Sequence, residues 1–288
     1  MATVLITGTS AGIGLTTALT VARAGHTVYA TMRDPARGSQ LADAAAKEKL
    51  PIHISTMDVD SDASVKAGMD AIYGDGKHLD VLVNNAGVEA TGPVEELPFE
   101  KIRAVMETNY FGVLRCIQAV VPDMRKRKSG CIINIGSLAG RIVVSPQACY
   151  AASKYAVEAV SEALAQEMYA FNVRVAIVEP GIVDTAMARR IEEAGSLGVY
   201  PQTQRFGHLF AASLRNPGKT SGVAEKVLEI IDSGTWQLRH PVGADAGPFL
   251  AWRSSMTDEE WVALNGASDD VWYERVERDF GMSIRPRN

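Results

Sequence analysis

Short apolar runs alternate with longer segments of helical periodicity along most of the chain. The predicted strands cover residues 3–7, 26–31, 52–57, 79–83, 130–135, 173–179 and 236–242, and most of them are apolar runs. The predicted helices cover residues 13–24, 41–49, 61–73, 99–126, 146–171 and 221–233. Fully apolar strands separated by helices predict a parallel sheet that is covered by helices on both faces. The predicted fold class is therefore α/β, with a doubly wound parallel sheet and a C-terminal helical extension.

The C-terminal third is less regular. Residues 185–216 show little periodicity and contain Gly195, Gly198 and Pro201, so we expect an irregular segment there. Further on, Thr257 and Glu260 match a capping box and predict the start of a helix. No repeat or linker interrupts the chain, and we therefore expect one domain over residues 1–288.

Composition narrows the class of protein. The chain has 288 residues, of which 47% are apolar and 22% charged, as expected for a globular domain. A net charge of −5 argues against a nucleic-acid binder. Three cysteines at irregular spacing favour a reduced, cytoplasmic protein. No apolar stretch approaches the roughly 20 residues that a membrane span needs, and no residue pattern suggests a metal site.

A glycine-rich turn joins the first predicted strand to the first helix. It reads Thr7-Gly8-x-x-x-Gly12-x-Gly14, with Thr9, Ser10 and Ile13 in the intervening positions. Glycines there permit a close backbone approach to a pyrophosphate, and the free N–H groups of the helix N-terminus then face its charge. Such a turn can also be a simple tight connection. Its place at the start of a βαβ pattern favours a Rossmann-like dinucleotide site.

The second strand bears on which dinucleotide binds. NAD-selective sites carry an acidic residue near the end of this strand, where it holds the ribose hydroxyls. Here Arg33 stands at that position, and no carboxylate precedes Asp34. A guanidinium group can pair with the 2′-phosphate of NADP, although it can also be a solvated strand end. We therefore expect NADP(H) to be preferred over NAD(H).

A tyrosine and a lysine have the spacing of neighbours on one helix face. Tyr150 and Lys154 are four residues apart in a predicted helix. An ammonium beside a phenol is expected to lower the tyrosine pKa, which suits proton transfer to and from a substrate oxygen. Ser137 follows the preceding strand, where its hydroxyl can hold the same oxygen. The spacing alone is common in helices, so its weight comes from its combination with Ser137 and the glycine turn.

These residues together resemble the short-chain dehydrogenase/reductase family. The resemblance rests on the glycine turn, Asn84-Asn85-Ala86-Gly87, Ser137, Tyr150-x-x-x-Lys154 and Pro180-Gly181 with Thr185, in the family's order. It implies Asn109 as a fourth catalytic residue, holding a water that relays protons to Lys154. It also implies a set of cofactor-binding positions outside the glycine turn, namely Asp58, Val59, Asn85, Ala86, Gly87, Tyr150, Lys154, Pro180, Gly181, Val183 and Thr185.

Within the family, residues 29–34 and the Gly92-Pro93 loop resemble hydroxysteroid and retinol dehydrogenases. This implies an alcohol or ketone that is bulky and apolar, such as a steroid, retinoid or aromatic ketone. We expect residues 1–184 to form the cofactor-binding and catalytic core, residues 185–220 a substrate-binding lid, and residues 221–288 the last strand and C-terminal helices. The expected substrate-lining residues are Ser137, Tyr150, Met187, Phe206 and Phe210.

Three points stay open in the sequence. Trp252, Trp261 and Trp272 can close the pocket or pack a helix, and packing is the default expectation. The resemblance implies a homodimer or homotetramer. An epimerase or dehydratase on the same fold and a non-catalytic NADP sensor are the alternative functions. The glycine spacing argues against the first alternative, and the presence of both Tyr150 and Lys154 argues against the second.

Overall fold

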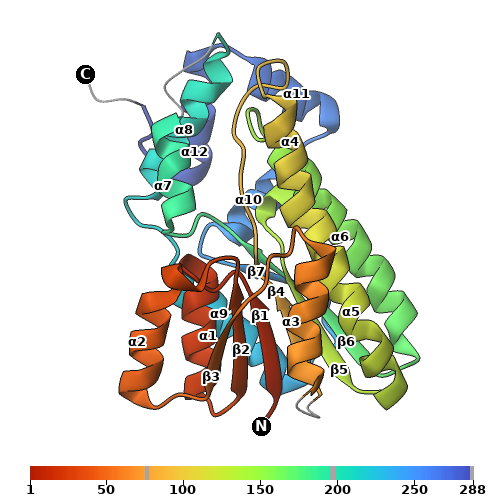
Figure 1. Cartoon of the computed structure of the whole chain (residues 1–288). Helices are drawn as coiled ribbons and strands as arrows, with labels where there is room; N and C mark the ends of the chain where they lie inside the picture. Colours follow the sequence, from red (N-terminus) through yellow and green to blue (C-terminus); the bar gives the residue numbers. More distant parts are fainter. Residues whose placement is uncertain (75–77, 195–198, 286–288) are drawn as a thin grey trace.

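The computed structural model describes residues 1–74, 78–194 and 199–285, and its centre is a seven-stranded parallel sheet (Figure 1). The strand order is β3-β2-β1-β4-β5-β6-β7, so the sheet grows in one direction up to β3 and in the other from β4. The strands are β1 (Thr3–Thr7), β2 (Thr27–Met32), β3 (Ile52–Thr56), β4 (Val81–Asn84), β5 (Gly130–Ile135), β6 (Val173–Pro180) and β7 (Arg239–Val242). The predicted doubly wound α/β fold is confirmed, and its reversal point between β1 and β4 is where such sheets bind ligands.

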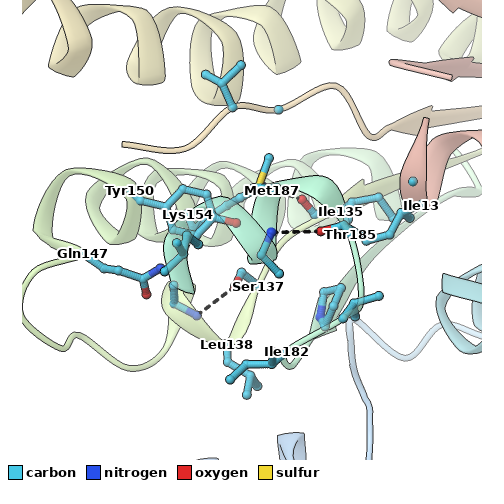
Figure 2. A pocket seen from close by; sticks show the side chains of 18 of the residues that line it. Ile13, Ile135, Ser137, Leu138, Gln147, Tyr150, Lys154, Ile182, Thr185 and Met187 are labelled. Atoms are coloured by element: carbon cyan, nitrogen blue, oxygen red, sulfur yellow. Dashed lines mark hydrogen bonds between the residues drawn. The ribbon is translucent and has the colours of Figure 1, made fainter. Parts of the chain in front are cut away.

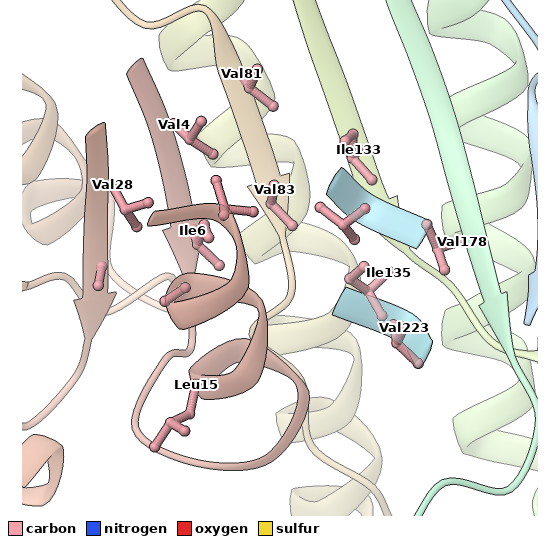
Figure 3. Packing of buried hydrophobic residues seen from close by; sticks show 14 of the residues in the cluster. Val4, Ile6, Leu15, Val28, Val81, Val83, Ile133, Ile135, Val178 and Val223 are labelled. Carbon is pink, nitrogen blue, oxygen red and sulfur yellow. The ribbon is translucent and has the colours of Figure 1, made fainter. Parts of the chain in front are cut away.

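Helices cover both faces of the sheet (Figure 1). One face carries α1 (Gly12–Arg23), α2 (Ser39–Glu48) and α9 (Thr220–Ser233), and the other carries α3 (Asp62–Gly74), α5 (Gly112–Arg127) and α6 (Ala148–Tyr169). Successive strand residues point to opposite faces, so Val4 and Ile6 pack toward α1 and α9 while Leu5 packs toward the other layer (Figure 3). Burying one such side chain contributes about 1.5–3 kcal/mol, which explains why the strands are apolar throughout.

The predicted helix over residues 99–126 is interrupted. The structure has α4 (Phe99–Met106), then a π-helical turn over Glu107–Phe111, then α5. Asn109 lies in the wide turn and is almost fully buried. Wide turns of this kind concentrate at functional sites. The residue singled out by the family resemblance therefore occupies a local deviation that apolar periodicity does not register.

The prediction of an irregular segment over residues 185–216 is wrong. The structure forms α7 (Ala186–Ala194) and α8 (Pro201–Ser213) there, while Gly195 and Gly198 lie outside the described residues. Pro201 starts α8 at a position where its missing N–H is tolerated. Apolar contacts between α8 and the C-terminal helices stabilise the segment, and these long-range contacts are not visible as periodicity.

The C-terminal helices complete a cap above the carboxyl edge of the sheet (Figure 1). They are α10 (Ala246–Ser254), α11 (Asp258–Gly266) and α12 (Asp269–Phe280). The predicted capping box at the start of α11 is present, with Thr257 and Glu260 each accepting a hydrogen bond from the other's backbone. The cap packs through its own apolar cluster, which includes Leu209 of α8 and Trp272 of α12.

Candidate active site

A cavity of about 540 Å³ lies between the carboxyl edge of the sheet and the C-terminal cap. Loops that follow β1, β2, β4, β5 and β6 line one part of it, and α7, α8 and the C-terminal helices line the rest. Nearly all predicted site residues reach this cavity. The two that do not are Thr9 and Asn109.

The glycine turn forms the floor of the cavity at β1. Gly8 and Gly12 have positive φ values of 70° and 58°, which L side chains rarely adopt. A Cβ on Gly14 would lie 2.3 Å from the Gly8 carbonyl oxygen and 2.4 Å from Nδ2 of Asn85. Asn85 braces the turn by donating to the carbonyls of Thr7 and Gly8 at 2.8 and 2.9 Å. The three glycines are therefore required by the packing of the turn.

Helix α1 opens directly onto this turn. Its N-cap, Ala11, offers no side-chain hydrogen bond, so the first N–H groups of the helix remain available to a phosphate. Ser10 and Ile13 line the cavity beside them. Thr9 instead turns toward β2, where its N–H and hydroxyl both donate to the carbonyl of Thr31 at 3.1 and 3.2 Å. Thr9 thus fastens the turn to the sheet.

Charged residues surround the part of the cavity beyond β2 and β3. Arg33 and Arg37 both line it, as do Asp58 and Val59. Asp60, which sequence reasoning missed, also faces this region, and its carboxylate accepts a hydrogen bond from the Thr108 hydroxyl at 3.0 Å. Burial raises the pKa of Asp60. Cationic and acidic groups therefore meet where the second nucleotide of a dinucleotide would extend.

Ser137, Tyr150 and Lys154 face the same part of the cavity (Figure 2). The Ser137 hydroxyl accepts a hydrogen bond from the N–H of Ala139 at 3.1 Å, which fixes it while leaving its proton free to donate. The Lys154 ammonium donates to the Ile135 carbonyl at 2.9 Å and lies 5.7 Å from the Tyr150 ring centroid. The three side chains come from the end of β5 and the first turns of α6.

The expected lowering of the Tyr150 pKa is not observed. Burial raises the pKa of Tyr150 to about 12, and hydrogen bonding to Ser137 offsets only part of this. Burial also lowers the pKa of Lys154 to about 8. The ammonium lies over the ring and is hydrogen-bonded to a carbonyl, so it does not oppose the desolvation of the phenol. Tyr150 is consequently protonated at neutral pH, which is the state needed to donate a proton.

Asn109 lies behind the cavity wall. Its side-chain amide accepts from the Val88 N–H at 2.8 Å and donates to the Val88 carbonyl at 2.9 Å and to the Ser153 hydroxyl at 3.0 Å. Ser153 in turn donates to the Tyr150 carbonyl. The structure thus links Asn109 to the helix that carries Tyr150 and Lys154. Its role in holding a water stays a prediction.

Aromatic side chains line the part of the cavity farthest from the glycine turn. Phe206 and Phe210 lie there, with ring centroids 4.7 Å apart, while Met187 lines the cavity from α7. The C-terminal helices contribute further lining residues. Trp252, Trp261 and Trp272 line the cavity, as one of the two open interpretations had it, and sequence reasoning missed Phe249, Asn265 and Val276.

The tryptophans satisfy their polar groups within the protein. The indole N–H of Trp252 donates to Asp279 at 2.7 Å, and that of Trp261 donates to the carbonyl of Val143 at 2.9 Å. Their rings pack edge to face at 5.0 Å. We expected these residues to serve packing, and they pack the cap and line the cavity at once. Their number after β7 was the only sequence signal.

Comparison with known proteins places this site in a family. The family model for short chain dehydrogenases matches residues 2–195. This chain is a short-chain dehydrogenase. Retinol dehydrogenase 8 from Bos taurus is 36% identical over 86% of this chain and 84% of its own length. A 3-ketodihydrosphingosine reductase from Bacteroides thetaiotaomicron is 38% identical over 66% of this chain and 68% of its own. The short-chain dehydrogenase is thus an oxidoreductase by family, and its predicted likeness to the retinol dehydrogenase branch is confirmed.

Solved structures agree with this assignment. A short-chain dehydrogenase from Streptomyces avermitilis superposes with a TM-score of 0.77 at 28% identity, covering 97% of this chain and 98% of that one. Across the described ranges, none of the helices has the length and apolar character needed to cross a membrane. The described residues also bring together no group of three or more His, Cys, Asp or Glu that could hold a metal ion.

Proposed function

We propose that this short-chain dehydrogenase interconverts an alcohol and a ketone or aldehyde with NADP(H), and that Tyr150 is its general acid and base. The observation that carries the proposal is the convergence of Tyr150, Ser137 and Lys154 on a cavity that also contains the glycine turn. A proton donor, a fixed hydroxyl and an ammonium beside a dinucleotide site are the groups that carbonyl reduction requires.

The chain's own residues have distinct parts in the reaction. Ser137 and Tyr150 hold the carbonyl oxygen, and Tyr150 donates its proton as negative charge develops there. The Lys154 ammonium, which donates to the Ile135 carbonyl in this structure, would hold the cofactor ribose and would stabilise the phenolate only after turning toward its oxygen. Bound NADPH supplies the hydride. In the oxidative direction Tyr150 accepts the proton of the alcohol instead.

The preference for NADP(H) rests on Arg33. Its side chain lines the cavity together with Arg37, and no acidic residue precedes Asp34 on the second strand. The positions proposed to hold the rest of the cofactor are those already described along the cavity. The glycine turn and the start of α1 face the pyrophosphate, and Asp58 and Val59 face the adenine. The nicotinamide is lined by Pro180, Gly181, Val183 and Thr185.

We propose a bulky, apolar substrate. The aromatic half of the cavity offers apolar ring faces, and the indole N–H groups of Trp252 and Trp261 are already paired, which favours a steroid-, retinoid- or aromatic-sized molecule. The retinol dehydrogenase relatives support the same class. Helices α7 and α8 serve as the lid in this proposal, within a single domain. Assembly as a homodimer or homotetramer and a cytoplasmic location stay predictions.

Titration of the purified protein with NADPH and NADH, followed by nicotinamide fluorescence, tests the cofactor. A panel of small and bulky ketones, followed by loss of NADPH absorbance, then tests the reaction. The proposal expects tighter binding of NADPH and turnover of a bulky ketone. Binding without turnover in either direction would favour the sensor alternative, and a preference for NADH would refute the assignment of Arg33.

A further inference from the structure

Two buried glutamates lie behind the active site and take no part in the proposed reaction. Glu158 is one helical turn beyond Lys154 in α6, and Glu179 is the last residue but one of β6. Their exposed fractions are 5% and 0%. The Nε atom of Arg239 lies 2.8 Å from Oε2 of Glu158 and 3.9 Å from Oε1 of Glu179, so the two carboxyl groups share a neighbour.

Each carboxyl group has one oxygen that accepts a hydrogen bond from an arginine and one oxygen that has no donor. Arg239 contacts Oε2 of Glu158, while Arg141 contacts Oε1 of Glu179 at 3.1 Å. Oε1 of Glu158 and Oε2 of Glu179 are buried and have no hydrogen-bond partner among the described residues. A buried carboxylate oxygen without a donor is strongly unfavourable. One proton placed between these two oxygens gives a partner to both.

We infer that Glu158 and Glu179 share one proton at mildly acidic pH and together position the Ser137 turn against Lys154. The shared state is one carboxylic acid donating to one carboxylate, as in other acid pairs that cannot both ionise. It carries a single negative charge, which Arg141 and Arg239 neutralise from two sides. No other reactant is involved, because the proton only moves between two carboxyl oxygens and solvent.

The surrounding charges are consistent with one retained proton. The pKa of Glu158 is raised to about 7, first by desolvation and also by the neighbouring Glu179, while the hydrogen bond from Arg239 opposes the rise. The titratable and charged groups that face Glu158 from the elements packed around it are Lys154, Tyr155 and Glu162 of α6, Glu179 of β6, Arg141 at the end of the Ser137 turn, and Arg239 of β7.

The pair lies directly under the turn that carries Ser137. A Cβ on Gly136 would be 3.5 Å from Oε1 of Glu158, which is the unpaired oxygen. A Cβ on Gly140 would be 3.0 Å from Cγ of Glu158 and 3.1 Å from the Lys154 carbonyl oxygen. The turn over Leu138–Gly140 therefore rests on α6 between Lys154 and Glu158. Loss of the shared proton would place two repelling charges beneath it.

Infrared spectroscopy of the full, ligand-free chain detects the shared proton, since a protonated carboxyl group has a carbonyl stretch distinct from that of a carboxylate. We expect a protonated-carboxyl signal at about pH 6 that disappears as the pH rises through about 7. Both Glu158→Gln and Glu179→Gln should remove it, because either substitution leaves one carboxylate with an arginine. Glu162→Gln, which removes the exposed partner of Arg239, is the matched control and should retain it.

Two outcomes would overturn the inference. One is a wild-type spectrum whose carboxyl signal matches that of both Gln variants, which would mean that neither glutamate is protonated. The other is a signal that survives Glu179→Gln but not Glu158→Gln, which would mean that Glu158 holds its proton alone. The titration of the wild-type signal needs no variant, so it remains decisive if a variant does not fold.

The positioning role has its own readout, and this part rests on the proposed function. Glu158→Gln keeps a neutral group under the Ser137 turn at every pH. The ratio of kcat/KM for this variant to that of the wild type should therefore rise severalfold as the pH increases through about 7. Glu158 also raises the pKa of Lys154, so Glu179→Gln, which leaves that contribution in place, is measured beside it. A ratio that rises for both variants supports the positioning role, and a rise for Glu158→Gln alone is an effect on Lys154 and refutes it. A ratio that stays constant with pH would refute the positioning role without bearing on the proposed reaction.

Discussion

The two halves of the cavity differ in what lines them: backbone in the nucleotide half and aromatic side chains in the substrate half. In the nucleotide half, the backbone of the glycine turn and the open N-terminus of α1 form the wall, and close contacts within the protein leave no space for a Cβ at Gly8 or Gly14. In the substrate half, aromatic side chains from α8 and from the C-terminal helices form the wall, and the indole N–H groups of Trp252 and Trp261 donate to partners within the protein. Tyr150, Ser137 and Lys154 stand where the halves meet.

The difference explains how one fold separates two tasks. The backbone wall faces the cofactor, which all members of the family use. Because the backbone conformation there requires glycine, this wall tolerates few substitutions. A wall of side chains from late in the chain can change without disturbing the sheet. If this division is correct, substitutions in one half should affect one ligand only, and removal of the Tyr150 hydroxyl at the junction should affect turnover far more than cofactor binding.

The largest effect is expected at the junction. Tyr150→Phe removes the only proton donor assigned to the substrate oxygen but keeps the ring, so turnover should fall by roughly 10²- to 10⁴-fold. NADPH binding, followed by nicotinamide fluorescence, should change little. Steady-state reduction of a ketone at neutral pH measures the loss. Unchanged turnover would remove Tyr150 from the mechanism.

Gly14→Ala should weaken cofactor binding in the nucleotide half. Its new Cβ would clash with the Gly8 carbonyl and with Asn85, so the turn must move and NADPH binding should weaken by at least about a hundredfold, equivalent to about 2.7 kcal/mol. Gly222→Ala is the matched control, because a Cβ there meets nothing within 4 Å. Equal binding by both variants would contradict the close packing of the turn.

Arg33→Ala should separate the two cofactors. Loss of one charge-assisted hydrogen bond costs about 1.5–3 kcal/mol, so NADPH should bind about ten- to a hundredfold more weakly. NADH lacks the 2′-phosphate and should bind as before. Arg23→Ala, which alters an exposed arginine paired with Glu48 on the outer helices, is the control. Losses of equal size for the two cofactors would refute the selectivity argument.

The smallest effect is expected in the substrate half. Phe210→Ala removes part of the aromatic wall, and KM for a bulky ketone should rise by about tenfold, equivalent to about 1.4 kcal/mol. KM for a small ketone and the affinity for NADPH should not change. Phe99→Ala is the control, since that ring is 68% exposed on α4. A parallel loss for small and bulky ketones would mean that the wall does not contact substrate.

The same division decides what could be predicted from the sequence. Local sequence determines the glycine turn, because its backbone geometry requires glycine. It also determines the pair Tyr150 and Lys154, because their spacing places them on one helix face. The strands were identifiable because burial on both faces makes them apolar throughout. The cavity accordingly contains nearly all of the residues predicted for the nucleotide half.

The substrate half and the pKa values depend on distant contacts. Trp252, Trp261 and Trp272 are placed in the cavity by packing among the C-terminal helices, which no local pattern encodes. The pKa of Tyr150 follows from burial and from the direction in which Lys154 points, and spacing on a helix gives neither. The Glu158–Glu179 pair joins α6 to β6 and was likewise invisible in the sequence.

The central claim is direct hydride transfer between NADP(H) and a carbonyl carbon within this cavity. The most direct test is reduction of a bulky apolar ketone with NADPH carrying deuterium at the transferable C4 position, followed by mass spectrometry of the product. We predict one deuterium on the carbinol carbon and stoichiometric oxidation of NADPH. Product without deuterium at that carbon, or no cofactor oxidation with any ketone or alcohol tested, would contradict the account.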